Sequence, residues 1–163
     1  MLLVSDANIF IDLERIGLLI EFSKLDIKIS TSDFVFNELN TKQQMLVKSL
    51  SIEIYTLPAE ELRKFFIEYQ ELGQVKISYQ DYSIYYFAKK HEACLLSNDK
   101  ALRKFSNKKN IEAKGIFYIL DLIIKYSKLS KNDLHTSISL LLNNSWLPKN
   151  EINIRLERLT SEL

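Results

Sequence analysis

The chain alternates short apolar runs with longer segments whose apolar residues recur at helical spacing. The short runs predict strands at residues 2–4, 27–29, 51–57, 93–96 and 111–113. The longer segments predict helices at residues 60–72, 116–126, 130–142 and 148–159. Residues 7–25 predict two short helices that are broken near Gly17. A further helix includes residues 34–39, with candidate caps at 30–32, and another begins at Ser78 or Gln80 and continues through 88. Strands that alternate with helices in this way are typical of a parallel sheet.

The alternation predicts an α/β fold with three layers, in which a mostly parallel sheet of about five strands carries helices on both faces. The last part of the chain is helical throughout, because Ser130 resembles a helix cap and Pro148 opens a final helix. We therefore expect a main domain over residues 1–128 and a helical extension over 129–163 that packs on it.

The composition narrows the choice of fold and partner. With 163 residues, the chain fits one domain of ordinary size. Only 3 glycines and 2 prolines are present, which argues against an all-β protein with many turns. The formal net charge of +1 disfavours broad electrostatic wrapping of duplex nucleic acid.

Cysteine usage and the lengths of the apolar runs indicate the cellular compartment of the protein. The single cysteine, Cys94, cannot form an internal disulfide, and no apolar run approaches the roughly 20 residues that span a bilayer. The first charge, at Asp6, comes too early for a secretory signal. We expect a cytoplasmic protein with no membrane partner.

Two aspartates directly follow predicted strands: Asp6 after the first, and Asp99 after the run at 93–96. Ligands of open parallel sheets bind beyond the carboxyl ends of the strands, so we expect both side chains at the same edge. Either residue alone could equally be a helix N-cap.

Two further acids face the predicted core. Asp81 lies on the apolar stripe of its helix, and Glu38 lies beside Val35 and Leu39. Buried carboxylates need compensation, and no matching set of inward lysines or arginines stands beside them. A divalent cation that prefers oxygen ligands, Mg²⁺ or Mn²⁺, is the simplest compensation, and it can activate water against a phosphodiester.

Four segments, in order, resemble the motifs of PIN-domain ribonucleases. Residues 4–13 resemble the opening motif, where a strand ends in Asp followed two positions later by Asn or Ser. Residues 34–39 resemble the second motif, which carries Glu, and residues 81–88 the third, an Asp that opens a helix. Residues 95–100 resemble the fourth, an apolar strand that ends in Ser/Thr-x-Asp.

The resemblance implies a PIN-like fold and a metal-dependent endoribonuclease. It assigns catalysis and the binding of one or two Mg²⁺ or Mn²⁺ ions to four acids: Asp6, Glu38, Asp81 and Asp99. Asn8 and Ser97 would be supporting polar groups that orient those carboxylates. Because many such proteins are toxins held by an antitoxin, and because residues 130–163 resemble helical extensions of toxin-like members, the resemblance also implies a toxin–antitoxin pair.

Other side chains have a structural and a functional interpretation. A basic stretch follows Asp99 and includes Lys100, Arg103 and Lys104. These side chains either lie on a solvated helix or bind RNA phosphates beside the metal site. Trp146 is expected to anchor the C-terminal helices, and Asp12 to lie on an exposed helical face. The aromatic residues of 82–87 are expected either in the core or in a dimer contact, rather than as a platform on which bases stack. Together with the apolar segment 16–20, they motivate the prediction of a homodimer.

A second function stays open at this point. Tyr82 stands directly after Asp81, where its ring could crowd the site, so the alternative is a catalytically weak or inactive PIN-like interaction module. Loss of metal-dependent RNA cleavage in an Asp→Asn variant would separate the two hypotheses.

Overall fold

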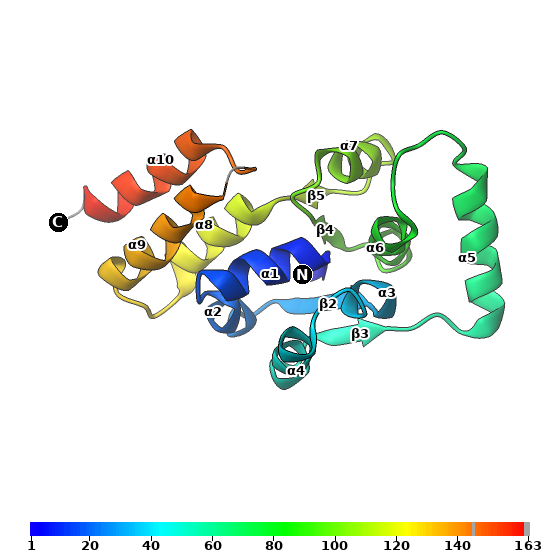
Figure 1. The fold of residues 1–163 in the computed structure, drawn as a ribbon, viewed down its shortest axis with the longest axis horizontal. Coiled ribbons are helices and arrows are strands. Elements are labelled where there is room, and N and C mark those ends of the chain that lie inside the picture. Colours follow the sequence, from blue (N-terminus) through cyan, green and yellow to red (C-terminus); the bar gives the residue numbers. More distant parts are fainter. Residues whose placement is uncertain (145, 162–163) are drawn as a thin grey trace.

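A parallel five-stranded sheet runs through the middle of the protein (Figure 1). The computed structural model describes residues 1–144 and 146–161. The strands are β1 (Leu2–Ser5), β2 (Lys28–Ser32), β3 (Glu53–Tyr55), β4 (Cys94–Leu96) and β5 (Ala113–Lys114). Their spatial order is β3-β2-β1-β4-β5, and every neighbouring pair is parallel. The predicted α/β class and the parallel sheet are confirmed.

Helices connect the strands and cover both faces of the sheet. They are α1 (Ala7–Arg15), α2 (Leu19–Ser23), α3 (Asp33–Phe36), α4 (Thr41–Ser49), α5 (Ala59–Glu71), α6 (Tyr79–Lys90), α7 (Lys100–Lys108), α8 (Ile116–Tyr126), α9 (Lys131–Ser139), the 3-10 helix η1 (Leu140–Asn143) and α10 (Lys149–Thr160). Helix α6 packs across β1, β2 and β4 and contacts α3, α5 and α7. Helix α1 contacts α2 and α4, and α2 contacts α8, which together form the other layer.

The middle of the sheet fixes which residues meet at its carboxyl edge. Strand β1 lies between β2 and β4, with Ser5 paired to Leu96. The backbone N–H of Asp6 continues this ladder by donating to Leu96 O at 2.9 Å. The segments that follow β1 and β4 therefore leave the sheet side by side.

The helix caps follow the local sequence. Side chains of Asp6, Ser32, Ser78, Asp99 and Ser130 each accept a hydrogen bond from a backbone N–H in the first turn of the helix that follows. These bonds satisfy donors that an α-helix start leaves without a partner. The predicted caps at Ser32 and Ser130 are confirmed, and Ser78 rather than Gln80 precedes α6. Asp6 and Asp99 do act as caps, which was the alternative to a site role for each. The break between α1 and α2 falls at Gly17, whose φ is +74°.

The second helical segment differs from the prediction. Helix α3 ends at Phe36, so Glu38 lies in the turn after it, and Ser30 and Thr31 belong to β2. Helix α4, which the hydrophobic pattern did not predict, follows at once. It has only Val47 buried, and it begins with a capping box between Asn40 and Gln43.

The aromatic residues of α6 are in the core. Tyr82, Tyr85, Tyr86 and Phe87 are all 9% exposed or less. The ring of Tyr82 packs against the rings of Phe65, Tyr69 and Tyr85, and its hydroxyl donates to Glu68 of α5 at 3.4 Å. The core interpretation of these residues is therefore confirmed, and they do not present exposed rings for a homodimer. A homodimer itself stays a prediction.

The C-terminal helices α9 and α10 lie beside α8 at one end of the molecule, and α5 lies at the opposite end (Figure 1). Arg155 of α10 is 6% exposed and donates to Asp121 of α8 at 2.7 Å and to Glu151 at 3.0 Å. Its guanidinium also lies 4.7 Å from the ring centre of Phe117. The contacts with Asp121 and Phe117 hold α10 on α8, whereas the bond to Glu151 lies within α10. The boundary at residues 128/129 stays a prediction.

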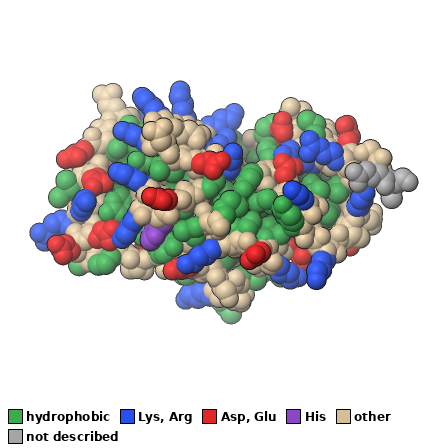
Figure 2. All heavy atoms as spheres, turned by 180° about the vertical axis from the view of Figure 1, so that it is seen from behind, with side chains coloured by type: hydrophobic (Ala, Val, Ile, Leu, Met, Phe, Trp, Pro, Cys, Tyr) green, Lys and Arg blue, Asp and Glu red, His purple; other side chains and the backbone are tan. Residues whose placement is uncertain are grey.

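The surface shown in Figure 2 carries lysine and arginine side chains interspersed with acidic ones around a central area of apolar side chains. This mixture agrees with the near balance of 22 basic and 21 acidic residues. Within the described residues, no helix is both long enough and apolar enough to cross a bilayer.

Candidate active site

Asp6 is the most deeply buried acid of the site. It follows β1 directly, is 3% exposed, and its Oδ1 accepts the backbone N–H of Ile9 at 3.0 Å. Its Oδ2 accepts a short hydrogen bond from Ser97 Oγ. The cap and the neighbouring strand thus fix both carboxylate oxygens at the carboxyl edge of the sheet.

Ser97 links the segments after β1 and β4. Its hydroxyl, which is fully buried, donates to Asp6 and accepts the backbone N–H of Asp99 at 3.0 Å. Asp99 is exposed, and its Oδ1 accepts the N–H of Leu102 at 2.7 Å as the cap of α7. The Ser97 hydroxyl therefore binds the side chain of one predicted site acid, Asp6, and the backbone N–H of a second, Asp99.

Asp81 and Glu38 lie within electrostatic range of the other acids. Asp81 is half-buried in the first turn of α6, next to the cap formed by Ser78. Burial and the charge of Asp99 both raise the pKa of Asp81, and the hydrogen bond from Ser78 opposes them. Glu38 is exposed in the turn after α3, so the prediction that it faces the core is wrong, because the helix ends before it. Partial desolvation together with the charge of Asp81 raises its pKa.

Burial raises the pKa of the Asp6 carboxyl from 3.8 to about 7. The charges of Asp81 and Asp99 act in the same direction, while the hydrogen bonds from Ser97 and Ile9 oppose it. No lysine or arginine of the described residues contributes to the pKa shifts of Asp6, Glu38 or Asp81. The site is thus a set of mutually repelling carboxylates whose charge has no cationic side chain to balance it.

These carboxylates suit a hard cation in charge and in donor type, since Mg²⁺ and Mn²⁺ prefer oxygen ligands. Within residues 1–144 and 146–161, no three acidic, histidine or cysteine side chains lie close enough together to hold an ion directly. The fit is therefore to an ion that keeps several waters and takes one or two protein carboxylates, which is the usual way in which Mg²⁺ binds.

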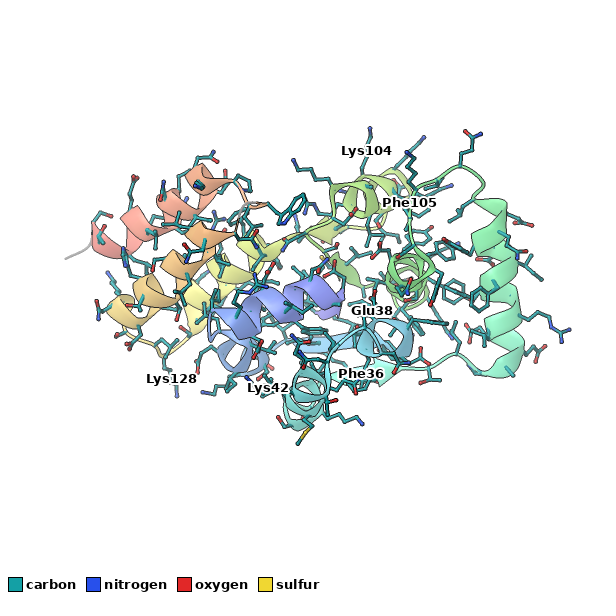
Figure 3. The ribbon with its side chains drawn as sticks, in the orientation of Figure 1. Phe36, Glu38, Lys42, Lys104, Phe105 and Lys128 are labelled. Atoms are coloured by element: carbon teal, nitrogen blue, oxygen red, sulfur yellow. The ribbon has the colours of Figure 1, made fainter. Side chains whose placement is uncertain are left out.

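The other predicted site residues lie around these acids. Asn8 is exposed in the first turn of α1, and its amide makes no hydrogen bond within the described residues. Lys100 and Lys104 are exposed on α7, and Figure 3 shows Lys104 pointing away from the sheet. Arg103 is half-buried and donates from Nη1 to Ser97 O at 2.8 Å. Arg103 therefore contacts the site backbone, while Lys104 points outward.

Three residues that the sequence reasoning did not place in the site support it. Asn98 Oδ1 accepts the backbone N–H of Ile116 at 2.9 Å, and Asn98 Nδ2 donates to Asp12 at 3.1 Å. Asp12 is half-buried, so the expectation of an exposed surface acid is wrong. Gly115 leaves room for these contacts, because a Cβ there would lie 3.1 Å from Arg103 Nη1 and 3.2 Å from Asn98 Oδ1. The sequence signal was the position of Asn98 between Ser97 and Asp99, in the turn after β4.

A family model described as a PIN domain matches residues 2–161. The chain belongs to the PIN-domain family. The match covers α9 and α10 as well as the sheet, and no curated protein matches the chain. PIN domains are typically nucleases that use divalent metals, and membership of the family supports, at that level, a hydrolase of phosphodiester bonds.

Proposed function

We propose that this PIN domain is an endoribonuclease that depends on Mg²⁺ or Mn²⁺ and uses Asp6, Glu38, Asp81 and Asp99. The observation that carries the proposal is the buried Asp6 carboxylate, fixed by Ser97 and repelled by two further acids without a balancing cation. A bound divalent ion supplies a polarised phosphoryl oxygen and an activated water.

The side chains have separate tasks in this proposal. Asp6, whose two oxygens are fixed by hydrogen bonds, presents a rigid ligand, and Ser97 keeps it in that orientation. Asp81 and Glu38, which are more accessible, would hold the attacking water or its proton. Arg103, Lys100 and Lys104 provide positive charge on α7 for the RNA phosphates, with Arg103 nearest to the site backbone.

The test is cleavage of a fluorescent single-stranded RNA with Mg²⁺, Mn²⁺ or EDTA. Asp6→Asn and Asp99→Asn should reduce cleavage to the level of the buffer. Asparagine caps a helix about as well as aspartate, so these variants remove the charge and keep the cap. Asp26→Asn is the matched control, because Asp26 is an exposed acid outside the site. Cleavage that persists in EDTA, or at the wild-type rate in Asp6→Asn, would contradict the proposal.

We also propose that the protein is the toxin of a toxin–antitoxin pair that acts on RNA in the cytoplasm. The resemblance of its C-terminal helices to those of toxin-like members supports this role. Expression of the wild type in bacteria should then arrest growth, whereas the folded Asp6→Asn variant should not. The product of a small upstream gene that overlaps this one should relieve the arrest and co-purify with the protein. Equal growth with both forms would contradict the toxin role.

One observation favours a second candidate, a PIN-like interaction module with weak or no catalysis. The described residues contain no ready group of three ligands for an ion. RNA cleavage with added metal separates the two candidates. If the protein is an interaction module, neither the wild type nor Asp6→Asn cleaves RNA, and both bind RNA or a partner protein equally well.

A further inference from the structure

A cavity of about 570 Å³ opens next to the acidic site, between α1, the turn after β4 and the segment that joins η1 to α10. Its walls include Asn8 and Arg15 of α1, Asn98 and Asp99 of the turn, and Asn143 and Trp146 of the C-terminal segment. Because Asp99 belongs both to this wall and to the predicted site, a molecule in the cavity lies beside the acids.

The C-terminal wall of the cavity is held by one carboxylate. Asp12 accepts hydrogen bonds from Asn98 Nδ2 at 3.1 Å and from Asn144 Nδ2 at 3.4 Å. Asn144 Oδ1 in turn accepts the backbone N–H of Trp146 at 2.9 Å. This chain of bonds fixes the backbone that carries Trp146 relative to α1 and to the turn that carries Asp99.

The groups that remain available in the cavity are those that recognise an unpaired nucleobase. Trp146 is 90% exposed, so it contributes a large aromatic face to the cavity and little to the core, and the expectation that it anchors the C-terminal helices is wrong. The amides of Asn8 and Asn143 are exposed and make no hydrogen bond within the described residues, so each offers a donor beside an acceptor. The Arg15 side chain is 62% exposed and lies 3.8 Å from Asp12.

We propose that this cavity binds one base of single-stranded RNA, stacked on Trp146 and hydrogen-bonded by Asn8 and Asn143, with Arg15 near its phosphate. The inference rests on the proposed function, in which RNA is the substrate. Recognition of RNA sequence targets unstacked bases that pair with aromatic faces and with polar side chains. A base in a duplex is stacked and paired, so the cavity selects single strands.

The test uses the fact that Trp146 is the only tryptophan of the chain. Its fluorescence is measured during titration with a short single-stranded oligoribonucleotide in EDTA, where the proposed cleavage does not occur. We expect saturable quenching. The same strand annealed to its complement should quench much less, and a polyanion without bases, inorganic polyphosphate, should not quench at all.

The contribution of each side chain is measured with variants, whose affinity for a labelled oligoribonucleotide is determined by fluorescence anisotropy. Trp146→Ala should weaken binding by about 5- to 150-fold, the range for one base stacked on an aromatic side chain. Asn143→Ala should weaken it less. Tyr126→Ala is the control, because Tyr126 is also an exposed aromatic residue, at 58%, and lies outside the cavity. Its affinity should equal that of the wild type. Trp146 and Asn143 are exposed, so equal melting temperatures should confirm that both variants fold.

The failures of the two proposals are distinguishable. Metal-dependent RNA cleavage with the wild-type KM in Trp146→Ala, and no quenching in the wild type, would overturn the base site and leave the endoribonuclease standing. Saturable quenching by single-stranded RNA without any cleavage in Mg²⁺ or Mn²⁺ would support the base site and overturn the endoribonuclease.

Discussion

Ser97 Oγ donates a hydrogen bond to Asp6 Oδ2 across the neighbouring strands β1 and β4, and both residues are buried. The same oxygen accepts the backbone N–H of Asp99. One hydroxyl therefore sets the positions of two predicted site residues. Its removal would leave a buried acceptor and a backbone donor without partners.

Ser97→Ala should lower the free energy of unfolding by about 1–3 kcal/mol, the usual cost of a buried polar group left without a partner. The pKa of Asp6 should rise further, because the hydrogen bond from Ser97 lowers it. Urea unfolding and the acid limb of the pH–rate profile measure the two effects. Ser97→Thr keeps the hydroxyl and should restore the pH profile. An unchanged profile in Ser97→Ala would show that Ser97 has no influence on the pKa of Asp6.

The metal-free protein should become less stable as the pH rises from 4 to 8. Asp6 has a folded-state pKa of about 7 against 3.8 for the unfolded chain, so the folded state binds more protons in this window. The stability that protonation of Asp6 contributes is fully present below pH 3.8 and is lost as the pH rises through about 7. The raised pKa values of Asp81 and Glu38 act in the same direction.

Urea unfolding in EDTA at pH 5 and pH 8 measures this dependence, which should be on the order of a few kcal/mol. Asp6→Asn should reduce the dependence of stability on pH but not abolish it, since Asp81 and Glu38 remain. If the stability of the wild type rises with pH over this window, Asp6 is not a carboxyl with a raised pKa.

Asp99→Asn should stabilise the metal-free protein and weaken its response to metal. Its charge raises the pKa of Asp6 and of Asp81, so its removal relieves repulsion. Asp99 is exposed, and the gain should stay below about 1 kcal/mol. Mn²⁺ or Mg²⁺ at a hundred times its dissociation constant should stabilise the wild type by roughly 2.7 kcal/mol. Thermal melting with and without metal gives both values, and a destabilised Asp99→Asn with no metal response would mark Asp99 as a cap alone.

Gly115→Ala should reduce nuclease activity far more than stability. The new Cβ would push on Arg103 Nη1 and Asn98 Oδ1, which contact the backbone of the site. Gly73→Ala is the control with the opposite expectation: a Cβ there meets no atom within 4 Å, but its φ of +61° strains alanine. That variant should lose about 1 kcal/mol of stability and keep its activity. Activity assays and urea unfolding of both variants separate the two effects, and equal activity of both would contradict the role of Gly115.

Arg155→Met should loosen the C-terminal helices. Methionine keeps much of the buried volume but loses the hydrogen bonds to Asp121 and Glu151, at a cost of about 1.5–3 kcal/mol. Limited proteolysis should then cut the chain between α8 and α10 sooner than in the wild type. Arg158→Met is the control, since its side chain is 65% exposed and lies 3.8 Å from Asp121. Identical proteolysis of both variants would show that Arg155 does not fasten α10.

The sequence predicted the sheet and the positions of its acids because strand ends and helix caps are local signals. Asp6 and Asp99 stand where an apolar run stops, and the pattern placed both correctly at the carboxyl edge. Helix α4 was missed because it buries only Val47, so its hydrophobic periodicity is weak. The capping box of Asn40 and Gln43 was a usable signal that hydrophobicity alone does not carry.

The residues around the cavity could not be predicted because they depend on long-range contacts. Asp12 is 132 positions from Asn144, and no local pattern joins them. Trp146 was expected to anchor the C-terminal helices, yet it is exposed in a turn whose backbone is held by Asn144. The catalytic and metal roles of Asp6, Glu38, Asp81 and Asp99 stay predictions until the variants are measured.

Both outer strands of the sheet are short, with three residues in β3 and two in β5. Such edges expose few unpaired backbone groups, so a foreign strand finds little to pair with. This arrangement protects the parallel sheet from edge-to-edge aggregation. A polypeptide that bound this protein would gain more from side-chain contacts on the helices and around the cavity than from extension of the sheet, which offers few hydrogen bonds.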